Sequence, residues 1–321
     1  MTLTNQSSIL TRNLVQESTP LVSIIIGNYN YENFIAKAID SALNQTYENV
    51  EVIVVDDGSE DNSREVISKY ENKIIPIYKE NGGQPSNYNA GFLASKGEII
   101  CFLDSDDWFV EEKIETLVQY FQTSEEIGWC FHSVKLVDKD NNTLPKVSKT
   151  QNYATEECDY RELLKSGKIP PCIPPSSALC FRRSILEKIL PMPAPKIITN
   201  NDYYVKFMAV ALSKGFILSD ALTVQKIHGN NAATLRNDRK HLKGRKLIYT
   251  GIWVKQEFPS FGKFADKMVA VGMALDWKAG NNDVENSKAI QNYFSSISFW
   301  NKCKINLITM YYFLKNKLQG K

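Results

Sequence analysis

The segment Asp104-Ser105-Asp106-Asp107 has the residue types and the spacing that could hold a divalent metal ion. It carries three carboxylates within four residues, directly after an apolar run that ends at Leu103. Such carboxylates repel one another, and leaving them unpaired in a cleft would be costly. A cation relieves this repulsion, because Mg²⁺ and Mn²⁺ prefer oxygen ligands and share them with substrate phosphates. One carboxylate of the pair Asp104 and Asp106 can then hold the metal while the other reaches a ribose hydroxyl. The alternative is an acidic turn that caps the next helix.

Two further polar segments could contact a ligand. In Asp56-Asp57-Gly58-Ser59, a carboxylate can accept hydrogen bonds from a base N–H or a sugar hydroxyl. The same residues also favour an ordinary turn. In Asn81-Gly82-Gly83-Gln84, the glycines allow the backbone to approach a ligand closely, although a simple turn is again the alternative.

The elements around these segments alternate between short buried strands and amphipathic helices. This alternation predicts an α/β fold with a mainly parallel, doubly wound sheet, in which ligands bind beyond the carboxyl ends of the strands. We therefore expect Asn28-Tyr29-Asn30, Asp56-Asp57 and the Asp104–Asp106 segment to converge on one edge of the sheet. The predicted strands are Leu21–Ile26, Val50–Val55, Ile74–Tyr78 and Glu98–Leu103, and the predicted helices are Tyr31–Asn44, Ser63–Tyr70 and Asn87–Ser95.

The pattern loosens after residue 114. The segment Lys168–Ser177 contains four prolines and is expected to be a shaped loop. A helix is predicted over Asp202–Lys214, closed by Gly215. The remaining predictions are helices at Val110–Thr123 and Ile185–Ile189, strands at Gly128–Val137 and Thr223–Ile227, and a mostly helical chain from Asp238 onward.

Four motifs in order resemble the family 2 inverting glycosyltransferases, which have the GT-A fold. They are Val22–Ile26 with Tyr29-Asn30, Val54–Ser59, Glu80–Gly83 with Asn89-Ala90-Gly91, and Gly97-Glu98 leading to Leu103–Asp107. The resemblance is dense over residues 20–115 and thins out toward residue 235. It implies a nucleotide-binding half at about 20–115 and an acceptor half at about 116–235.

The resemblance also implies roles for individual residues in a nucleotide-sugar site. Asp57 would bind the nucleobase, and Gly27, Asn28 and Tyr29 would line the same pocket with Gly83. Asp104 would touch the ribose or the metal, and Asp106 would coordinate Mn²⁺ or Mg²⁺ on the diphosphate. That metal would stabilise the negative charge of the leaving nucleoside diphosphate.

Two later residues complete the implied site. An inverting transfer needs a general base, and the family position for it matches Asp202 in Asn201-Asp202-Tyr203-Tyr204. Helix capping is the alternative role for Asp202, because a helix should begin there. His228, in His228-Gly229-Asn230-Asn231, would complete the metal site or contact the diphosphate, with a purely structural histidine as the alternative.

Three positions depart from the family pattern. Gly27-Asn28 stands where many members have Pro-Thr or a similar pair, which changes the side-chain contacts to the base. Tyr88 occupies a position that is often Arg, so a cationic contact near the nucleotide is missing. Asn201 replaces the acid that usually precedes the base.

Composition and charge add limits on compartment and partners. The net charge of the 321-residue chain is +2, yet residues 226–321 hold 17 Lys or Arg against 6 Asp or Glu. Six cysteines without a metal-like spacing are expected to be reduced packing residues. The polar N-terminus has no apolar signal segment, and no run is long enough to span a membrane. We therefore expect a cytoplasmic protein whose basic C-terminal region packs on the rest of the chain or on a second subunit, or rests on the inner membrane face.

The sequence thus predicts a leader at 1–19, a GT-A domain at 20–235 and a helical basic region at 236–321. The expected function is metal-dependent inverting transfer from a nucleotide-sugar, with UDP-sugars favoured, to a glycan or lipid-linked acceptor hydroxyl in cell-surface polysaccharide, lipopolysaccharide or glycolipid assembly. One alternative is a nucleotidyltransferase, which usually has a basic phosphate loop that Gly27–Asn33 lacks. The other is a non-catalytic nucleotide-sugar-binding protein that acts through a partner. No nucleic-acid partner is expected.

Overall fold

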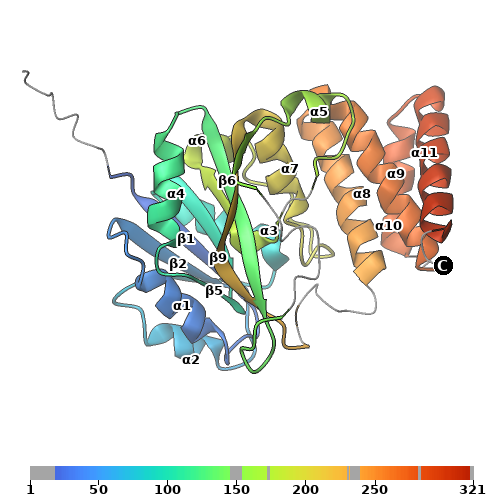
Figure 1. Cartoon of the computed structure of the whole chain (residues 1–321). Helices are drawn as coiled ribbons and strands as arrows, with labels where there is room; N and C mark the ends of the chain where they lie inside the picture. Colours follow the sequence, from blue (N-terminus) through green and yellow to red (C-terminus); the bar gives the residue numbers. More distant parts are fainter. Residues whose placement is uncertain are drawn as a thin grey trace, which may run out of the picture.

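A nine-stranded mixed sheet forms the centre of the computed structural model, which describes residues 19–144, 154–171, 174–229, 231, 239–280 and 283–318 (Figure 1). The strand order is β3-β2-β1-β4-β8-β6-β9-β5, and β7 pairs with β9. All but the last residue of the expected leader at 1–19 lies outside the described residues. Cys172 and Asn230 lie outside them as well. The strands are β1 (Val22–Asn28), β2 (Val50–Asp56), β3 (Ile75–Tyr78), β4 (Ile99–Asp104), β5 (Asp107–Phe109), β6 (Ile127–Val137), β7 (Glu156–Cys158), β8 (Leu179–Arg182) and β9 (Lys214–Lys226).

The N-terminal half of the sheet is parallel, and its inner strands β2, β1 and β4 are buried on both faces. Strands β3, β2, β1 and β4 run side by side in parallel, so their carboxyl ends lie at one edge. Successive residues of a strand point to opposite faces. Accordingly, Ile24 and Ile26 of β1 pack in one hydrophobic cluster with α1 (Ile35–Leu43), α2 (Ser63–Ser68) and α4 (Lys113–Gln122), whereas Ile25 packs in the cluster on the other face. This arrangement confirms the predicted α/β fold.

Antiparallel strands enter the second half of the sheet. Strand β8 lies antiparallel between β4 and β6, and the short strands β5 and β7 pair antiparallel with β9. None of these three strands was predicted, because three or four residues carry too little periodicity to show a strand. Cys101, Cys130 and Cys180 lie at matching positions of β4, β6 and β8, and the five described cysteines are free.

Several predicted boundaries were wrong. Helix α7 (Tyr203–Leu212) ends before Gly215, which lies inside β9 and does not close the helix. A Cβ at Gly215 would lie 2.2 Å from atoms of Trp129, so the residue is small because a neighbouring strand packs against it. Helix α3 (Gly83–Ala94) begins four residues before its predicted start, and helix α4 begins three residues after its predicted start.

The chain after residue 239 is helical, as predicted. It forms α8 (Arg239–Glu257), α9 (Gly262–Lys278), α10 (Val284–Ser295) and α11 (Phe299–Leu318), which Figure 1 shows stacked beyond α7. Trp253 of α8 and Phe264 of α9 belong to the same hydrophobic cluster as Phe102 of β4 and Trp129 of β6. The helices therefore share a core with one face of the sheet. Among the described helices, none is long and apolar enough to cross a membrane. The short helices α5 (Arg161–Lys165) and α6 (Arg183–Leu186) complete the fold.

Candidate active site

A cleft of about 610 Å³ opens at the carboxyl ends of β1, β2 and β4. This volume lies within the range of small-molecule sites. The structure brings to its walls eight of the nine site residues expected from the sequence, and the ninth, His228, reaches the site through Asp106. The eight are Gly27, Asn28, Tyr29, Asp57, Gly83, Asp104, Asp106 and Asp202.

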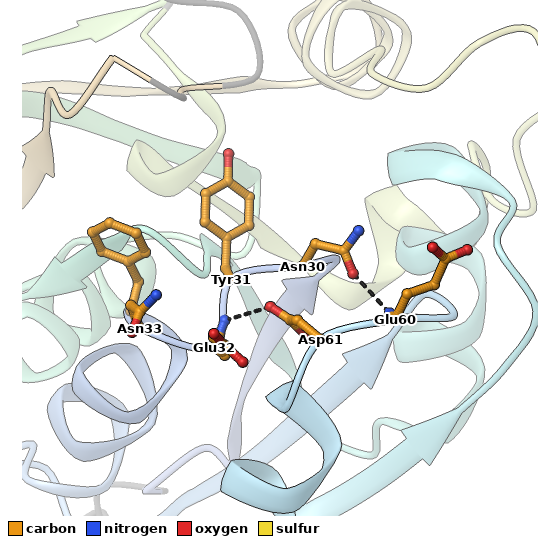
Figure 2. Close-up of a pocket in the computed structure, with 7 residues that line it drawn as sticks. Asn30, Tyr31, Glu32, Asn33, Glu60 and Asp61 are labelled. Atoms are coloured by element: carbon orange, nitrogen blue, oxygen red, sulfur yellow. Dashed lines mark hydrogen bonds between the residues drawn. The ribbon is translucent and has the colours of Figure 1, made fainter.

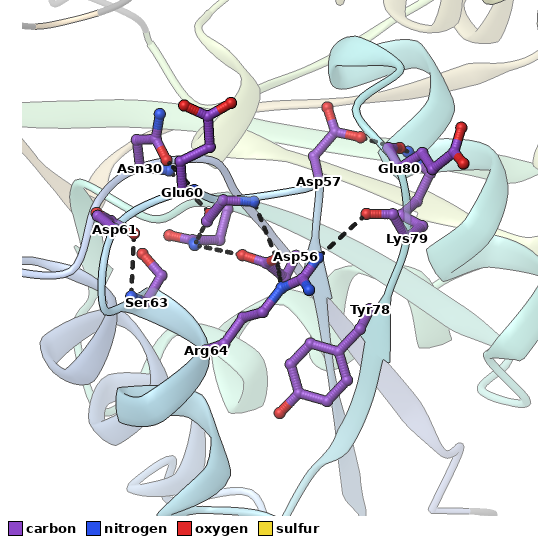
Figure 3. Close-up of polar contacts among 12 residues, drawn as sticks. Asn30, Asp56, Asp57, Glu60, Asp61, Ser63, Arg64, Tyr78, Lys79 and Glu80 are labelled. Carbon is purple, nitrogen blue, oxygen red and sulfur yellow. Dashed lines mark hydrogen bonds and ion pairs between the residues drawn. The ribbon is translucent and has the colours of Figure 1, made fainter.

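Asp57 and Asp56 have different surroundings at the end of β2 (Figure 3). The buried Asp57 carboxylate accepts hydrogen bonds from the backbone N–H groups of Gly82 (2.9 Å) and Gly83 (2.7 Å) and forms an ion pair with Lys79. Asp56 instead receives Arg64 Nε at 2.8 Å and the backbone N–H of Ser59 at 3.1 Å. Burial opposes the charge of Asp56, but these hydrogen bonds hold its pKa below the ordinary value. Asp56 thus organises the loop, and Asp57 faces the cleft.

The loops after β1 and β2 are tied to each other beside the cleft. Figure 2 shows Asn30 Oδ1 accepting the backbone N–H of Glu60 at 2.7 Å and Asp61 Oδ2 accepting that of Glu32 at 2.9 Å. These contacts surround a shallow hollow of about 410 Å³ that adjoins the cleft through Asn30 and Tyr31. The loop that carries Asn28 and Tyr29 is therefore fixed by the loop that carries Asp57.

Buried amide oxygens point to a ligand at this end of the cleft. Within the described residues, the Oδ1 atoms of Asn28 and Asn87 are buried and have no hydrogen-bond partner. Buried polar atoms are almost always paired, so such oxygens suit the N–H or hydroxyl groups of a bound molecule. Both residues line the cleft near Gly27, where an added Cβ would lie 3.3 Å from Asn87 Nδ2.

Gly83 allows two loops to meet. It has a φ of +76°, and a Cβ there would lie 2.7 Å from the carbonyl oxygen of Ile198. A side chain would therefore be strained by its backbone and would displace the loop that leads to Asp202. The sequence identified this segment as a possible close approach to a ligand, and the close approach found here is to the protein's own backbone.

Asp104 and Asp106 present oxygen ligands without a third acidic partner. Asp106 Oδ2 contacts His228 Nε2 at 3.1 Å and Asn231 Nδ2 at 3.0 Å, and its other oxygen accepts no hydrogen bond from the residues that the structure describes. Asp107 is turned away, because its carboxylate accepts the Ser177 hydroxyl at 2.6 Å. Across the described ranges, no group of three or more His, Cys, Asp or Glu side chains is arranged to hold a metal ion.

This pair nevertheless fits a magnesium or manganese ion that a substrate diphosphate also binds. Such ions are commonly held by one or two carboxylates together with phosphate oxygens and water. Burial raises the pKa of Asp104 to about 7, and the negative charge of Asp106 adds to the rise. A cation at this place would relieve both effects.

Asp202 lies at the N-terminus of α7, but its side chain makes no capping bond there. Its carboxylate instead lies between two lysines, with Oδ2 at 2.7 Å from Lys206 Nζ and Oδ1 at 3.9 Å from Lys246 Nζ. Burial alone would raise the pKa of Asp202, but Lys206 and then Lys246 outweigh it and lower the pKa. The carboxylate is therefore charged at neutral pH, which a proton acceptor requires.

Several residues of the cleft were not identified from the sequence as site residues, among them Asn87, Gln84, Ser176 and Lys246. Gln84 lies 3.5 Å from Asp104 Oδ1 and 3.2 Å from the Ser176 hydroxyl, and its Oε1 accepts the backbone N–H of Asn201 at 3.0 Å. Gln84 is the last residue of the segment Asn81–Gln84, which the sequence did single out, but only for the backbone of its glycines. Ser176 and Lys246 lie in a proline-rich loop and an ordinary basic helix, where no sequence signal marks them.

The sheet and the cleft together define an α/β protein with an acidic, nucleotide-sized site at the carboxyl edge of its parallel strands. The sequence model of glycosyl transferase family 2 matches residues 23–190. An uncharacterized glycosyltransferase of Nostoc sp. is 38% identical over 65% of this chain and 66% of its own length. One of Rickettsia typhi is 32% identical over 74% of this chain and 73% of its own. The chain belongs to glycosyl transferase family 2, and it is a glycosyltransferase.

A solved structure supports the fold. Staphylococcus aureus TarS 1–349, crystallised in complex with UDP-GlcNAc, is 16% identical with a TM-score of 0.65, over 94% of this chain and 92% of its own. At this identity the likeness concerns the fold alone, and it confirms the predicted GT-A-like architecture.

Proposed function

We propose that this protein catalyses inverting transfer of a sugar from a nucleotide-sugar, with UDP-sugars favoured, to an acceptor hydroxyl, with the help of Mn²⁺ or Mg²⁺. The observation that carries the proposal is that the pair Asp104–Asp106 and the charged carboxylate of Asp202 line one cleft. TarS 1–349 was crystallised with UDP-GlcNAc, and a mannosyltransferase of Pyrobaculum calidifontis, 15% identical with a TM-score of 0.50, with GDP-Man and Mn²⁺.

Each residue has a distinct task in the proposed reaction. Asp57, Asn28 and Asn87 hold the nucleoside, and Gly27, Tyr29 and Gly83 shape the pocket around it. Asp104 and Asp106 would hold the metal, which would supply positive charge for the departing nucleoside diphosphate, and His228 holds Asp106 in place. Asp202 takes the proton of the acceptor hydroxyl as that oxygen attacks the anomeric carbon from the side opposite the leaving group.

A thermal-shift screen tests this proposal. UDP-, GDP- and dTDP-sugars are each added with and without Mn²⁺, because a ligand that binds only the folded state raises the melting temperature. We expect stabilisation by one nucleotide class that requires the metal. If no nucleotide-sugar stabilises the protein, the proposed donor site is wrong.

We also propose that the reaction takes place at the cytoplasmic face of a membrane, on a glycan or lipid-linked acceptor used in cell-surface assembly. We retain the division into a GT-A domain at 20–235 and a basic region at 236–321, with α11 as the membrane-facing helix. Trp300 (79% exposed) and Leu307 (72% exposed) lie on a stripe of apolar side chains with Phe299, Met310, Tyr311 and Leu314. This set is called the α11 stripe below.

Charge favours a membrane over a second subunit as the partner of the α11 stripe. Residues 299–318 contain four lysines and no acidic residue, so two copies would bring like charges together. Lys263, Lys267 and Lys304 line a hollow of about 420 Å³ together with Leu307 and Tyr311 of the α11 stripe. Anionic lipid headgroups complement these lysines, and Trp and Tyr suit the membrane interface.

Replacing Trp300 and Leu307 together with Glu is expected to weaken binding to phosphatidylglycerol vesicles at least tenfold, because it removes apolar area and adds like charge to the lipid. Vesicle flotation measures this, with pure phosphatidylcholine as the neutral comparison. The matched control is Val284→Glu, an exposed apolar residue of α10. The membrane proposal is wrong if the unchanged chain binds neither kind of vesicle. It is also wrong if light scattering shows that the unchanged chain is a dimer and that the double variant is a monomer.

A further inference from the structure

Helix α8 forms one wall of the part of the cleft around Asp202, which is called the catalytic corner below. The helix lies outside the segment that the family model matches. Thr250 of α8 exchanges hydrogen bonds of 3.1 Å with the side chain of Asn201, the residue just before Asp202. Lys246, one turn earlier, contacts Asn200 Oδ1 and lines the cleft. The helix therefore fixes Asn200 and Asn201, the two residues that precede Asp202.

Lys246 differs from the other lysine beside Asp202. Lys206 Nζ lies 2.7 Å from Asp202 Oδ2 and donates to the Pro174 carbonyl at 3.2 Å, so its charge is used within the protein. Lys246 Nζ is held by a neutral amide oxygen and lies 3.9 Å from Asp202 Oδ1, beyond hydrogen-bond distance. Among the described residues that line the cleft, Lys246 is the sole cation.

The gap between Asp202 Oδ1 and Lys246 Nζ has the size of one bridging oxygen atom. An oxygen at about 2.8 Å from each of two atoms that are 3.9 Å apart satisfies the geometry of both hydrogen bonds. We propose that the acceptor hydroxyl binds in this gap and that Lys246 is a second catalytic residue, which stabilises the negative charge that develops on the attacking oxygen. This inference rests on the proposed role of Asp202 as the base.

The step balances within the groups named. The hydroxyl donates its O–H proton to Asp202 Oδ1 and accepts a hydrogen bond from Lys246 Nζ. Its oxygen forms a bond to the anomeric carbon. The bond from that carbon to the donor phosphate oxygen breaks, and the electron pair leaves with the nucleoside diphosphate. Lys246 keeps its own protons throughout.

A second catalytic group would compensate for the low basicity of Asp202. Two lysines lower the pKa of Asp202, and a carboxylate with a low pKa is a weak base. A cation against the same hydroxyl makes that hydroxyl more acidic, so the proton transfer regains the driving force that the base has lost. Lys206 is less suited to this role, because it already donates to Asp202 Oδ2 and the Pro174 carbonyl and is not among the described residues that line the cleft.

The test compares Lys246→Met, Lys246→Arg and the control Lys240→Met, an exposed lysine of the same helix. Because the acceptor is unidentified, water serves as the nucleophile. Release of nucleoside diphosphate from the donor is followed over hours at high enzyme concentration. We expect Lys246→Met to lower this rate about 100-fold, Lys246→Arg to retain part of it, and the control to match the unchanged enzyme. Donor affinity should stay within about twofold in all three.

The pH dependence separates catalysis from a merely structural contact. Lys246 faces Asp202 and Lys206 of α7, Asp104 of β4 and the ring of Tyr203. Burial and then Lys206 lower its pKa, while Asp202 and Asp104 oppose this. The rate should therefore fall as the pH rises through this lowered pKa. In Lys246→Arg the fall should move to higher pH, because guanidinium stays protonated.

Two results would overturn the inference. One is a rate for Lys246→Met equal to that of Lys240→Met. The other is a loss of donor affinity as large as the loss of rate, which would place Lys246 on the donor phosphate. Failure of the proposed function itself has a different signature, since the unchanged enzyme would then release no nucleoside diphosphate, or Asp202→Asn would release it at the full rate.

Discussion

Replacing Asp202 with Asn is expected to lower the rate of sugar transfer about 1,000-fold while the affinity for the donor changes by no more than about twofold. The amide keeps the shape of the carboxylate but cannot take the proton of the acceptor hydroxyl, and a general base contributes rate factors of this order. Release of nucleoside diphosphate measures the rate, and calorimetry with a non-hydrolysable donor analogue measures the affinity.

The two lysines beside Asp202 make a control for stability necessary. The single variant leaves Lys206 and Lys246 facing a neutral side chain, and breaking a buried ion pair in this way costs about 3–5 kcal/mol. The double variant Asp202→Asn with Lys206→Met removes the close pair together. We expect it to recover part of the lost melting temperature and none of the lost rate. A double variant that recovers both would show that Asp202 acts only through stability.

The lowered pKa of Asp202 also fixes the acid side of the pH profile. A group whose pKa is depressed keeps its charge until the pH falls below its ordinary range, so Asp202 alone should cause no loss of rate between pH 5 and 7. Unchanged turnover in Asp202→Asn would remove this residue from the mechanism and favour the alternative of a nucleotide-sugar-binding protein that acts through a partner.

Replacing Asp106 with Ala is expected to abolish the part of donor binding that depends on Mn²⁺. At a donor concentration 100 times the Kd, binding adds about 2.7 kcal/mol to the unfolding free energy, or roughly 5 °C in melting temperature for a chain of this size. This metal-dependent shift should disappear in the variant. The thermal-shift assay with and without Mn²⁺ reads it directly.

Two further variants separate metal binding from local packing. Asp106 also accepts hydrogen bonds from His228 and Asn231, so its loss could loosen that segment. Asp106→Asn keeps the size of the side chain and should lose the metal-dependent shift with a melting temperature closer to that of the unchanged protein. Asp140→Ala, in an exposed turn, controls for the loss of one acidic residue. A full manganese-dependent shift in Asp106→Ala would contradict the metal assignment.

The sequence alone determined the parallel half of the sheet and the residues at its edge. β1, β2 and β4 are continuous apolar runs that end in polar clusters, and this pattern has few other solutions. Because parallel strands end at one edge, Asp57, Asp104 and Asp106 had to lie near one another. The family resemblance then added Asp202 and His228, which no local pattern connects to the others.

The tertiary structure alone decided which side chains surround Asp202. Lys246 is 44 residues away from Asp202 along the chain. It lies in a helix whose basic residues indicate only a charged surface. Likewise, Gly215 has the sequence context of a helix stop, yet it lies in a strand against Trp129. Periodicity reports which face of an element is apolar, whereas the contact between two elements depends on how they pack. The catalytic corner is built from such contacts, because α7 and α8 meet there through the core that the helical region shares with the sheet.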